Sequence, residues 1–301
     1  MSDQQTVGPT GGPTGAIHDI GYRHYDGPRL GASYIRRSLY LDTLRGAFGL
    51  GRSARSKVMP FLLLALMVLP AVTIGIVTGY FGFDELPLDY VRYTFAFQVA
   101  ITIFLGSQSP AAMSRDLRFR VAPLYFSRPL SRQQYVQAKF AGLSTALFIL
   151  TALPLTLLLA GAMLAKLPLD EQLPDYLRSM AGALVLSVVL AGIGLVVAAM
   201  TPRRGLGVAA VVGVLLVLSG IQATVRGLAE EFGNDTFAGY AGLISPFSLV
   251  DGVVATAFQG ESVMGTPPAG VLMGAVFCLV VVAIVAGCYA ALLARYRKAL
   301  S

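Results

Sequence analysis

The stretch that decides the fold is residues 114–139, SRDLRFRVAPLYFSRPLSRQQYVQAK. It carries six of the chain's 23 lysines and arginines and a single acid, Asp116. Two long apolar runs flank it, YTFAFQVAITIFLGSQSPAAM at 93–113 and FAGLSTALFILTALPLTLLLAGAML at 140–164. A basic segment between apolar runs of this length is typical of a cytoplasmic loop that joins two membrane-spanning helices.

The composition extends this interpretation to the whole chain. Of its 301 residues, 55% are hydrophobic and 13% are charged, against about 25% charged in an ordinary soluble domain. The mean hydropathy is +0.68, and several apolar runs are long enough to cross a hydrocarbon core of about 30 Å as helices. We therefore predict an all-α integral membrane protein. The net charge of +7 is explained by basic cytoplasmic loops, and no nucleic-acid partner is expected.

The pattern predicts six transmembrane helices. They are expected at about 59–80, 93–113, 140–165, 179–200, 206–225 and 270–294. Alternate segments between these spans, beginning with the N-terminal tail, contain 19 of the 23 basic residues, and the others contain 4. Because lysine and arginine accumulate on the cytoplasmic side, we expect a multi-pass protein of the cell membrane with both termini in the cytoplasm.

Residues 240–260, YAGLISPFSLVDGVVATAFQG, are ambiguous. They could form a seventh span, but they contain Pro246 and Asp251, and a further crossing would place the basic C-terminus outside. A short re-entrant or surface-lying helical piece on the outer side, between the fifth and sixth spans, is the preferred prediction.

The N-terminal region is predicted to have two parts. Residues 1–32 are expected to be a flexible cytoplasmic tail, and 33–58 an amphipathic interfacial helix with its connector, before the six-span domain of 59–301. The helix prediction rests on one apolar face that would lie on the inner membrane surface. That face consists of Tyr40, Leu41, Leu44, Ala47 and Phe48. The alternative is a helix docked on soluble protein.

The second half of the basic stretch contains a helix start. Ser131 and Gln134 fit a capping box, and Leu130 and Tyr135 fit a hydrophobic staple. A helix from 132 to 164 would measure about 50 Å, so its first turns should project into the cytoplasm. The first half can form a short helix that Pro123 ends. This segment could rest on lipid phosphates or form a docking surface for a cytoplasmic partner.

The segment SRDLRFRVAPLYFSRPLSRQQYVQAK between the second and third spans resembles the membrane subunits of ABC transporters of the type-2 permease class. The resemblance covers about residue 33 to the end, and the tail IHDIGYRHYDGPRLG is similar to permeases of this class from actinobacteria. It implies a coupling helix that seats in a groove of a separate ATPase. The residues expected to contact the ATPase are Arg115, Asp116, Leu117, Arg118, Phe119, Arg120 and Leu124, and those of the adjoining cytoplasmic turn are Arg128, Pro129 and Arg132. The family often has Glu near the loop start, and Asp116 is the nearest match here.

The sequence lacks the motif for ATP hydrolysis. GLGRSARSKV at 49–58 is basic and glycine-rich, but no glycine precedes Lys57 and no hydroxyl follows it, so it is not a P-loop. No cofactor is expected in this chain, and ATP and Mg²⁺ are expected in the partner ATPase. His18 and His24 fit no metal-site spacing. The chain is therefore expected to be non-catalytic.

Apart from boundary residues, the predicted spans carry no ionisable side chain. This argues against a proton-coupled transporter and against an intramembrane enzyme. Neutral polar and aromatic residues remain, which suit an amphipathic, lipid-like or drug-like substrate, although hydrogen bonding between helices is the alternative. The candidate path residues are Phe97, Gln98, Phe104, Gln108 and Gln222.

These features predict the permease subunit of an ATP-driven exporter. Its expected partners are two ABC ATPase subunits, a second permease copy or a homologous permease, and membrane lipids. A membrane anchor or sensor that recruits an ATPase without transporting is the alternative. Two Gly-x-x-x-Gly spacings, Gly75/Gly79 and Gly270/Gly274, are weak signals of close helix contact.

Overall fold

The computed structural model describes residue 27 and residues 30–113, 130–201, 204–260, 262–264 and 270–298. Residues 31–301 form one compact unit. The described residues fold into helices without strands. The helices are α1 Ala32–Ala47, α2 Ala54–Phe81, α3 Tyr90–Ala96, α4 Gln98–Ala112, α7 Arg132–Leu164, α8 Leu169–Met200, α9 Arg204–Glu231, α10 Asp235–Ala241, α11 Pro246–Ala257 and α12 Val271–Lys298.

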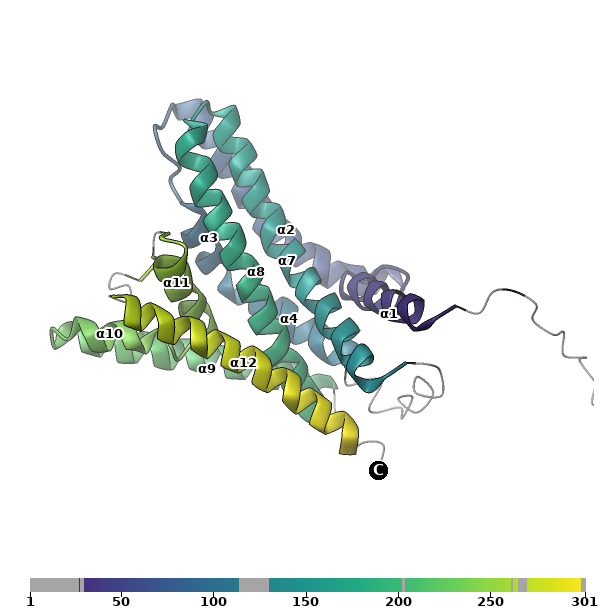
Figure 1. The fold of residues 1–301 in the computed structure, drawn as a ribbon. Helices are drawn as coiled ribbons and strands as arrows, with labels where there is room; N and C mark the ends of the chain where they lie inside the picture. Colours follow the sequence, from purple (N-terminus) through teal and green to yellow (C-terminus); the bar gives the residue numbers. More distant parts are fainter. Residues whose placement is uncertain are drawn as a thin grey trace, which may run out of the picture. The chain divides into compact units, whose positions relative to one another are not determined.

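The helix lengths confirm an all-α integral membrane protein. Five helices of the described residues, α2, α7, α8, α9 and α12, are each long and apolar enough to cross a bilayer. The bent pair α10–α11 would make six if it counted as one span. In Figure 1, α2, α7 and α8 lie side by side, while α9 and α12 cross them at an angle.

The predicted start of α7 is confirmed. The Ser131 hydroxyl accepts a hydrogen bond from the Gln134 amide at 3.2 Å, and the Gln134 side chain accepts one from the Ser131 amide at 3.0 Å. Leu130 and Tyr135 are both buried, as a hydrophobic staple requires. The helix then continues for 33 residues to Leu164.

The predicted second span, 93–113, is not a single helix. At Phe97 the backbone departs from helical geometry (φ −96°, ψ 15°), which separates α3 from α4. Alone, α4 has 15 residues, fewer than the roughly 20 that a span needs. Anchoring of α3 accompanies the break: the Tyr93 hydroxyl donates to the Met67 carbonyl of α2, and the Tyr90 hydroxyl donates to Gln172 of α8 at 2.9 Å.

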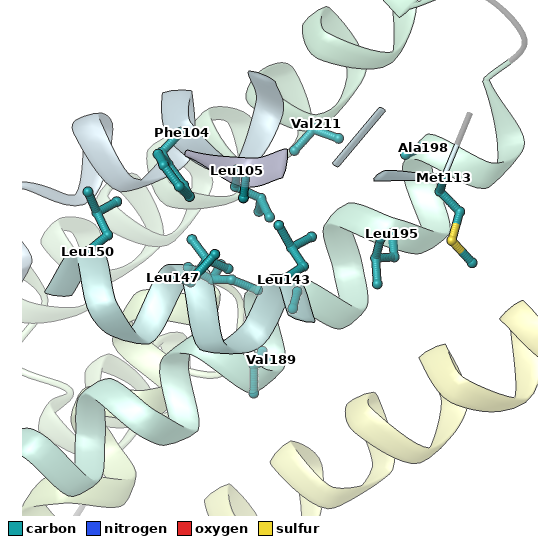
Figure 2. Packing of buried hydrophobic residues seen from close by; sticks show 14 of the residues in the cluster. Phe104, Leu105, Met113, Leu143, Leu147, Leu150, Val189, Leu195, Ala198 and Val211 are labelled. Atoms are coloured by element: carbon teal, nitrogen blue, oxygen red, sulfur yellow. The ribbon is translucent and has the colours of Figure 1, made fainter. Parts of the chain in front are cut away.

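The core lies where α4, α7, α8 and α9 meet. Figure 2 shows Phe104 and Leu105 of α4 facing Leu143 and Leu147 of α7, with Val189 and Leu195 of α8 in the same cluster. In lipid such helices are held by close van der Waals contact, because lipid tails are as apolar as the side chains. The most apolar window of α8 is 61% buried, against 17% for α9 and α12. Therefore α8 is the central helix, and α9 and α12 present free apolar faces.

Helix α1 docks on protein, which corrects the predicted face in part, since Ala47 and Phe48 of that face are buried. Its fully buried residues are Leu39, Thr43 and Ala47, whereas Tyr40, Leu41 and Leu44 are half-buried. Thr43 lies against Gly142 of α7, where a Cβ would come within 2.7 Å of the threonine side chain. The Tyr40 hydroxyl also donates to Thr145 of α7 at 3.1 Å.

The ambiguous region 240–260 is a helical hairpin. Helices α10 and α11 are bent by 118° across residues 242–245, and Pro246 occupies the first turn of α11, where a proline is readily tolerated. With 7 and 12 residues, neither helix can cross a bilayer alone. A bend of this size is found both in a re-entrant loop, as predicted, and in a broken span.

Candidate functional site

Four chain segments converge at the end of the unit that carries the basic stretch. The Tyr135 ring near the start of α7 lies 5.1 Å from the Tyr296 ring near the end of α12, and both side chains are fully buried. The Arg295 side chain donates to the carbonyl of Ala199, near the end of α8, at 3.3 Å. Since α4 ends beside the same stretch, at Met113, four helices have their basic ends together.

The residues predicted to contact an ATPase fall mostly outside the described residues. Arg132 is the exception, and it is exposed in the first turn of α7. The predicted coupling and turn residues that lie outside the described part are Arg115, Asp116, Leu117, Arg118, Phe119, Arg120, Leu124, Arg128 and Pro129. The structure describes the two anchors of the stretch, Met113 and Leu130, and both are buried.

A buried cation lies next to these anchors. The side chain of Lys139 on α7 is 5% exposed, and its ammonium lies 5.7 Å from the centroid of the Tyr135 ring, within the range of a cation–π interaction. Lys139 and Gln108 line a small cavity of about 20 Å³, which Arg52 and Asp42 also border. This cavity lies between α1, α4 and α7, and Ala112 at the end of α4 lines it.

The opposite end of the unit brings the remaining connections together. Tyr90 at the start of α3 lies beside Tyr176 of α8, with ring centroids 6.0 Å apart. Gly260, after α11, lies next to Arg178 of α8. Successive loops therefore lie at opposite ends of the unit, as expected for a chain that crosses the membrane back and forth.

Asp251 on α11 is a buried acid that sequence analysis did not select as a site residue. Its side chain is 4% exposed. It accepts hydrogen bonds from the Ser262 hydroxyl at 2.7 Å, the Val263 amide at 3.1 Å and the Met264 amide at 3.4 Å. The carboxylate therefore ties the segment after α11 back to the hairpin. In the sequence, Asp251 stands out as an acid within an otherwise apolar run, and this could have identified it.

Asp251 also borders a cavity of about 40 Å³ between α3, α8 and α11. Its polar lining includes Thr94 and Ser179. The Ser179 hydroxyl is buried and has no hydrogen-bond partner among the described residues. A cavity of this size has room for water, which would satisfy that hydroxyl.

The five predicted path residues have different neighbours in the structure. Phe104 is fully buried, with its ring 5.7 Å from that of Phe48. Phe97 lies 4.9 Å from Tyr93. The other three are amides in different surroundings. Gln98 has a buried carbonyl oxygen without a described partner, Gln108 borders the cavity beside Lys139, and Gln222 of α9 donates to the sulfur of Met264 at 3.9 Å.

Large apolar side chains are exposed along α2, α9 and α12. On α2 they include Val58, Leu62, Leu66 and Leu69, which are 50–64% exposed and share one helical face. Faces of this kind are stable in contact with acyl chains or with another membrane helix.

The architecture defines a class: a multi-pass, all-α integral membrane protein with a helical hairpin after α9 and a protein-docked N-terminal helix. Within the described residues, no group of three or more His, Cys, Asp or Glu side chains could hold a metal ion.

Comparison with family models then identifies the family. Residues 122–298 match the model described as ABC-2 family transporter protein. The chain belongs to this family and is a transporter membrane subunit. Comparison with curated proteins finds no match.

Proposed function

We propose that the chain is the permease subunit of an ATP-driven exporter, with ATP hydrolysis supplied by a separate ABC ATPase. The convergence of the ends of α4, α7, α8 and α12 is the observation that carries the proposal. The Tyr135–Tyr296 and Arg295–Ala199 contacts join the ends of α7, α8 and α12, and Met113 after α4 lies in the same buried cluster. A force applied to the basic stretch 114–129 would therefore reach several spans through buried contacts.

The segment proposed to receive that force is 114–127. Its apolar side chains would enter a groove of the ATPase, and its charges would pair with the groove's rim. The long α7 supports this role, because a helix of 33 residues measures about 50 Å and so projects about 20 Å beyond a hydrocarbon core of about 30 Å. The cytoplasmic side is assigned to this end from the basic residues.

The functional assembly is proposed to contain two permease subunits and two ATPases. One subunit exposes apolar faces on α2, α9 and α12, and a second copy or a homologous permease could cover part of them. The core between α4 and α7 is filled by side chains such as Phe104, so a path for a large substrate would form between two subunits more readily than within one. An amphipathic, lipid-like or drug-like substrate is proposed.

The assembly is tested on the complex purified from membranes in mild detergent. Native mass spectrometry should detect two copies of the chain with two ABC ATPase subunits, and the complex should hydrolyse ATP. A single copy of the chain in an ATP-hydrolysing complex would contradict the proposal. Direction is tested in inside-out membrane vesicles, where export appears as ATP-dependent uptake of an amphipathic dye. ATP-dependent release from such vesicles would indicate import.

A further inference from the structure

A third cavity opens where α1 turns into α2. It measures about 580 Å³ and is lined by residues of one face of α1 together with the connector at 50–52. The turn that shapes it is a Schellman motif: the Leu50 amide donates to the Arg45 carbonyl at 2.8 Å, and the Gly49 amide donates to the Gly46 carbonyl at 3.1 Å. Gly49 has φ +67°, and a Cβ there would lie 2.5 Å from the Ser56 carbonyl oxygen. The chain therefore needs glycine at this turn.

The turn brings Arg52 of the connector close to two arginines of α1. Arg37 and Arg45 lie two helical turns apart on α1 and line the cavity with Arg52 of the connector. Arg52 lies over α1 at Gly46, where a Cβ would come within 3.1 Å of a guanidinium nitrogen. Gly46 thus leaves space for the Arg52 side chain beside the helix.

The lining has an excess of positive charge. Asp42 is its one acid, against three arginines. Within the described residues, none of the three guanidinium groups forms an ion pair. Tyr34 and Ser38 add two hydroxyl groups to the same lining. Arginine binds phosphate oxygens through two parallel hydrogen bonds, and three guanidinium groups offer more donors than a single carboxylate can accept.

The surroundings favour a lipid as the source of that phosphate. Leu41 and Leu50 line the same cavity, and Leu50 is 44% exposed. The exposed apolar face of α2 begins at Val58, six residues after Arg52, and continues through Leu62 to Leu69. A headgroup phosphate held at the arginines would place its acyl chains at the start of this face.

We propose that the cavity between α1 and the 50–52 connector binds the headgroup phosphate of an anionic phospholipid, held by Arg37, Arg45 and Arg52. The proposal does not depend on the ATPase or on the direction of transport. The lipid would bind the face of α1 that points away from α7.

The test uses the full-length purified protein and native mass spectrometry, with phosphatidylglycerol and phosphatidylcholine as probes. Wild-type protein should retain phosphatidylglycerol in preference to the zwitterionic lipid. Arg45→Gln and Arg52→Gln should each weaken phosphatidylglycerol binding roughly fivefold, the effect expected for one basic group at an anionic lipid. Arg36→Gln is the matched control, because Arg36 is exposed on α1 but does not line the cavity, and it should leave binding unchanged.

Three outcomes would overturn the proposal. Equal retention of the two lipids would show no site for an anionic headgroup. An equal loss of phosphatidylglycerol binding in Arg36→Gln would show that binding depends on the overall positive charge of the surface and not on this cavity. Displacement of phosphatidylglycerol by excess inorganic phosphate would identify a soluble phosphate as the ligand. The three substituted residues are exposed, so an unchanged thermal unfolding profile is expected for each variant and confirms that binding is compared between folded proteins.

Discussion

Gly75 of α2 and Gly161 of α7 face each other at a point where the two helix backbones lie against one another. A Cβ on Gly161 would lie 2.6 Å from the Cα of Gly75, and one on Gly75 would lie 2.7 Å from the Cα of Gly161. The obstructing atoms are backbone, which cannot rotate away. Gly79 continues the contact one turn later, against Ala165.

We therefore expect Gly161→Ala to force α2 and α7 apart. Overpacking of this kind costs about 1–3 kcal/mol, and thermal unfolding in detergent should occur at a lower temperature. Gly220→Ala on α9 is the control, because no atom lies within 4 Å of its Cβ position. It should be neutral or slightly stabilising, since alanine is the better helix former. Equal stability of Gly161→Ala and the control would show that the contact is not tight.

We expect the hydrogen bonds of Asp251 to fix the position of residues 262–264, which follow α11. Asp251→Ala removes the acceptor of the Val263 and Met264 amides and of the Ser262 hydroxyl. Leaving such donors unpaired costs about 1–3 kcal/mol. Hydrogen exchange at Val263 and Met264 should become faster, and Asp251→Asn should have a smaller effect because it keeps one acceptor oxygen.

The control for this change is Ser262→Ala, which removes one donor and leaves both amide contacts in place. It should change exchange at Val263 and Met264 less than Asp251→Ala does. Unchanged exchange in Asp251→Ala would contradict the role assigned to the carboxylate.

The orientation of the chain can be tested by labelling from outside. Asp84 and Gln133 are both exposed and lie at opposite ends of the unit. In a chain whose Cys278 and Cys288 are replaced by serine, an impermeant maleimide on intact cells should label Asp84→Cys and not Gln133→Cys. Labelling of Gln133→Cys alone would reverse the orientation, and labelling of both would contradict the alternation of the loops.

The start of α7 was predictable because its signals are local. Ser131 and Gln134 are three residues apart, and the capping box they form needs no distant partner. The close approach at Gly75 was indicated by its spacing from Gly79, although the partner Gly161 was not. Spacing shows which residues share a face, but not which helix that face meets.

The misjudged face of α1 has a physical explanation. Thr43 is polar and was not expected in the contact, yet it is 6% exposed. Its hydroxyl donates to the carbonyl of Leu39 at 2.8 Å, one turn earlier. A threonine whose hydroxyl is already hydrogen-bonded within its own helix can be buried against another helix at little cost. The apolar pattern alone therefore shifted the predicted face toward Tyr40, Leu41 and Leu44.

Asp251 and the arginine-lined cavity depend on contacts that the sequence does not reveal. The partners of Asp251 lie 11 to 13 residues later, a separation that matches no helical or strand period. The sequence does not indicate that Arg37 lies with Arg45 and Arg52 around one cavity. The break at Phe97 likewise follows from anchoring of Tyr90 and Tyr93 to other helices.

The central claim, that 114–127 couples the permease to an ATPase, is tested most directly by co-purification of the ATPase with single variants. Truncating one partner of a buried charged hydrogen bond costs about 2–5 kcal/mol, whereas one basic contact to lipid headgroups contributes about 1 kcal/mol. Asp116→Ala and Phe119→Ala should therefore weaken ATPase binding by about thirtyfold or more, while the permease still inserts. Asp84→Ala, an exposed acid at the opposite end, should have no effect. Normal ATPase binding and transport in both coupling variants would contradict the claim and leave the stretch as a basic surface that faces lipid.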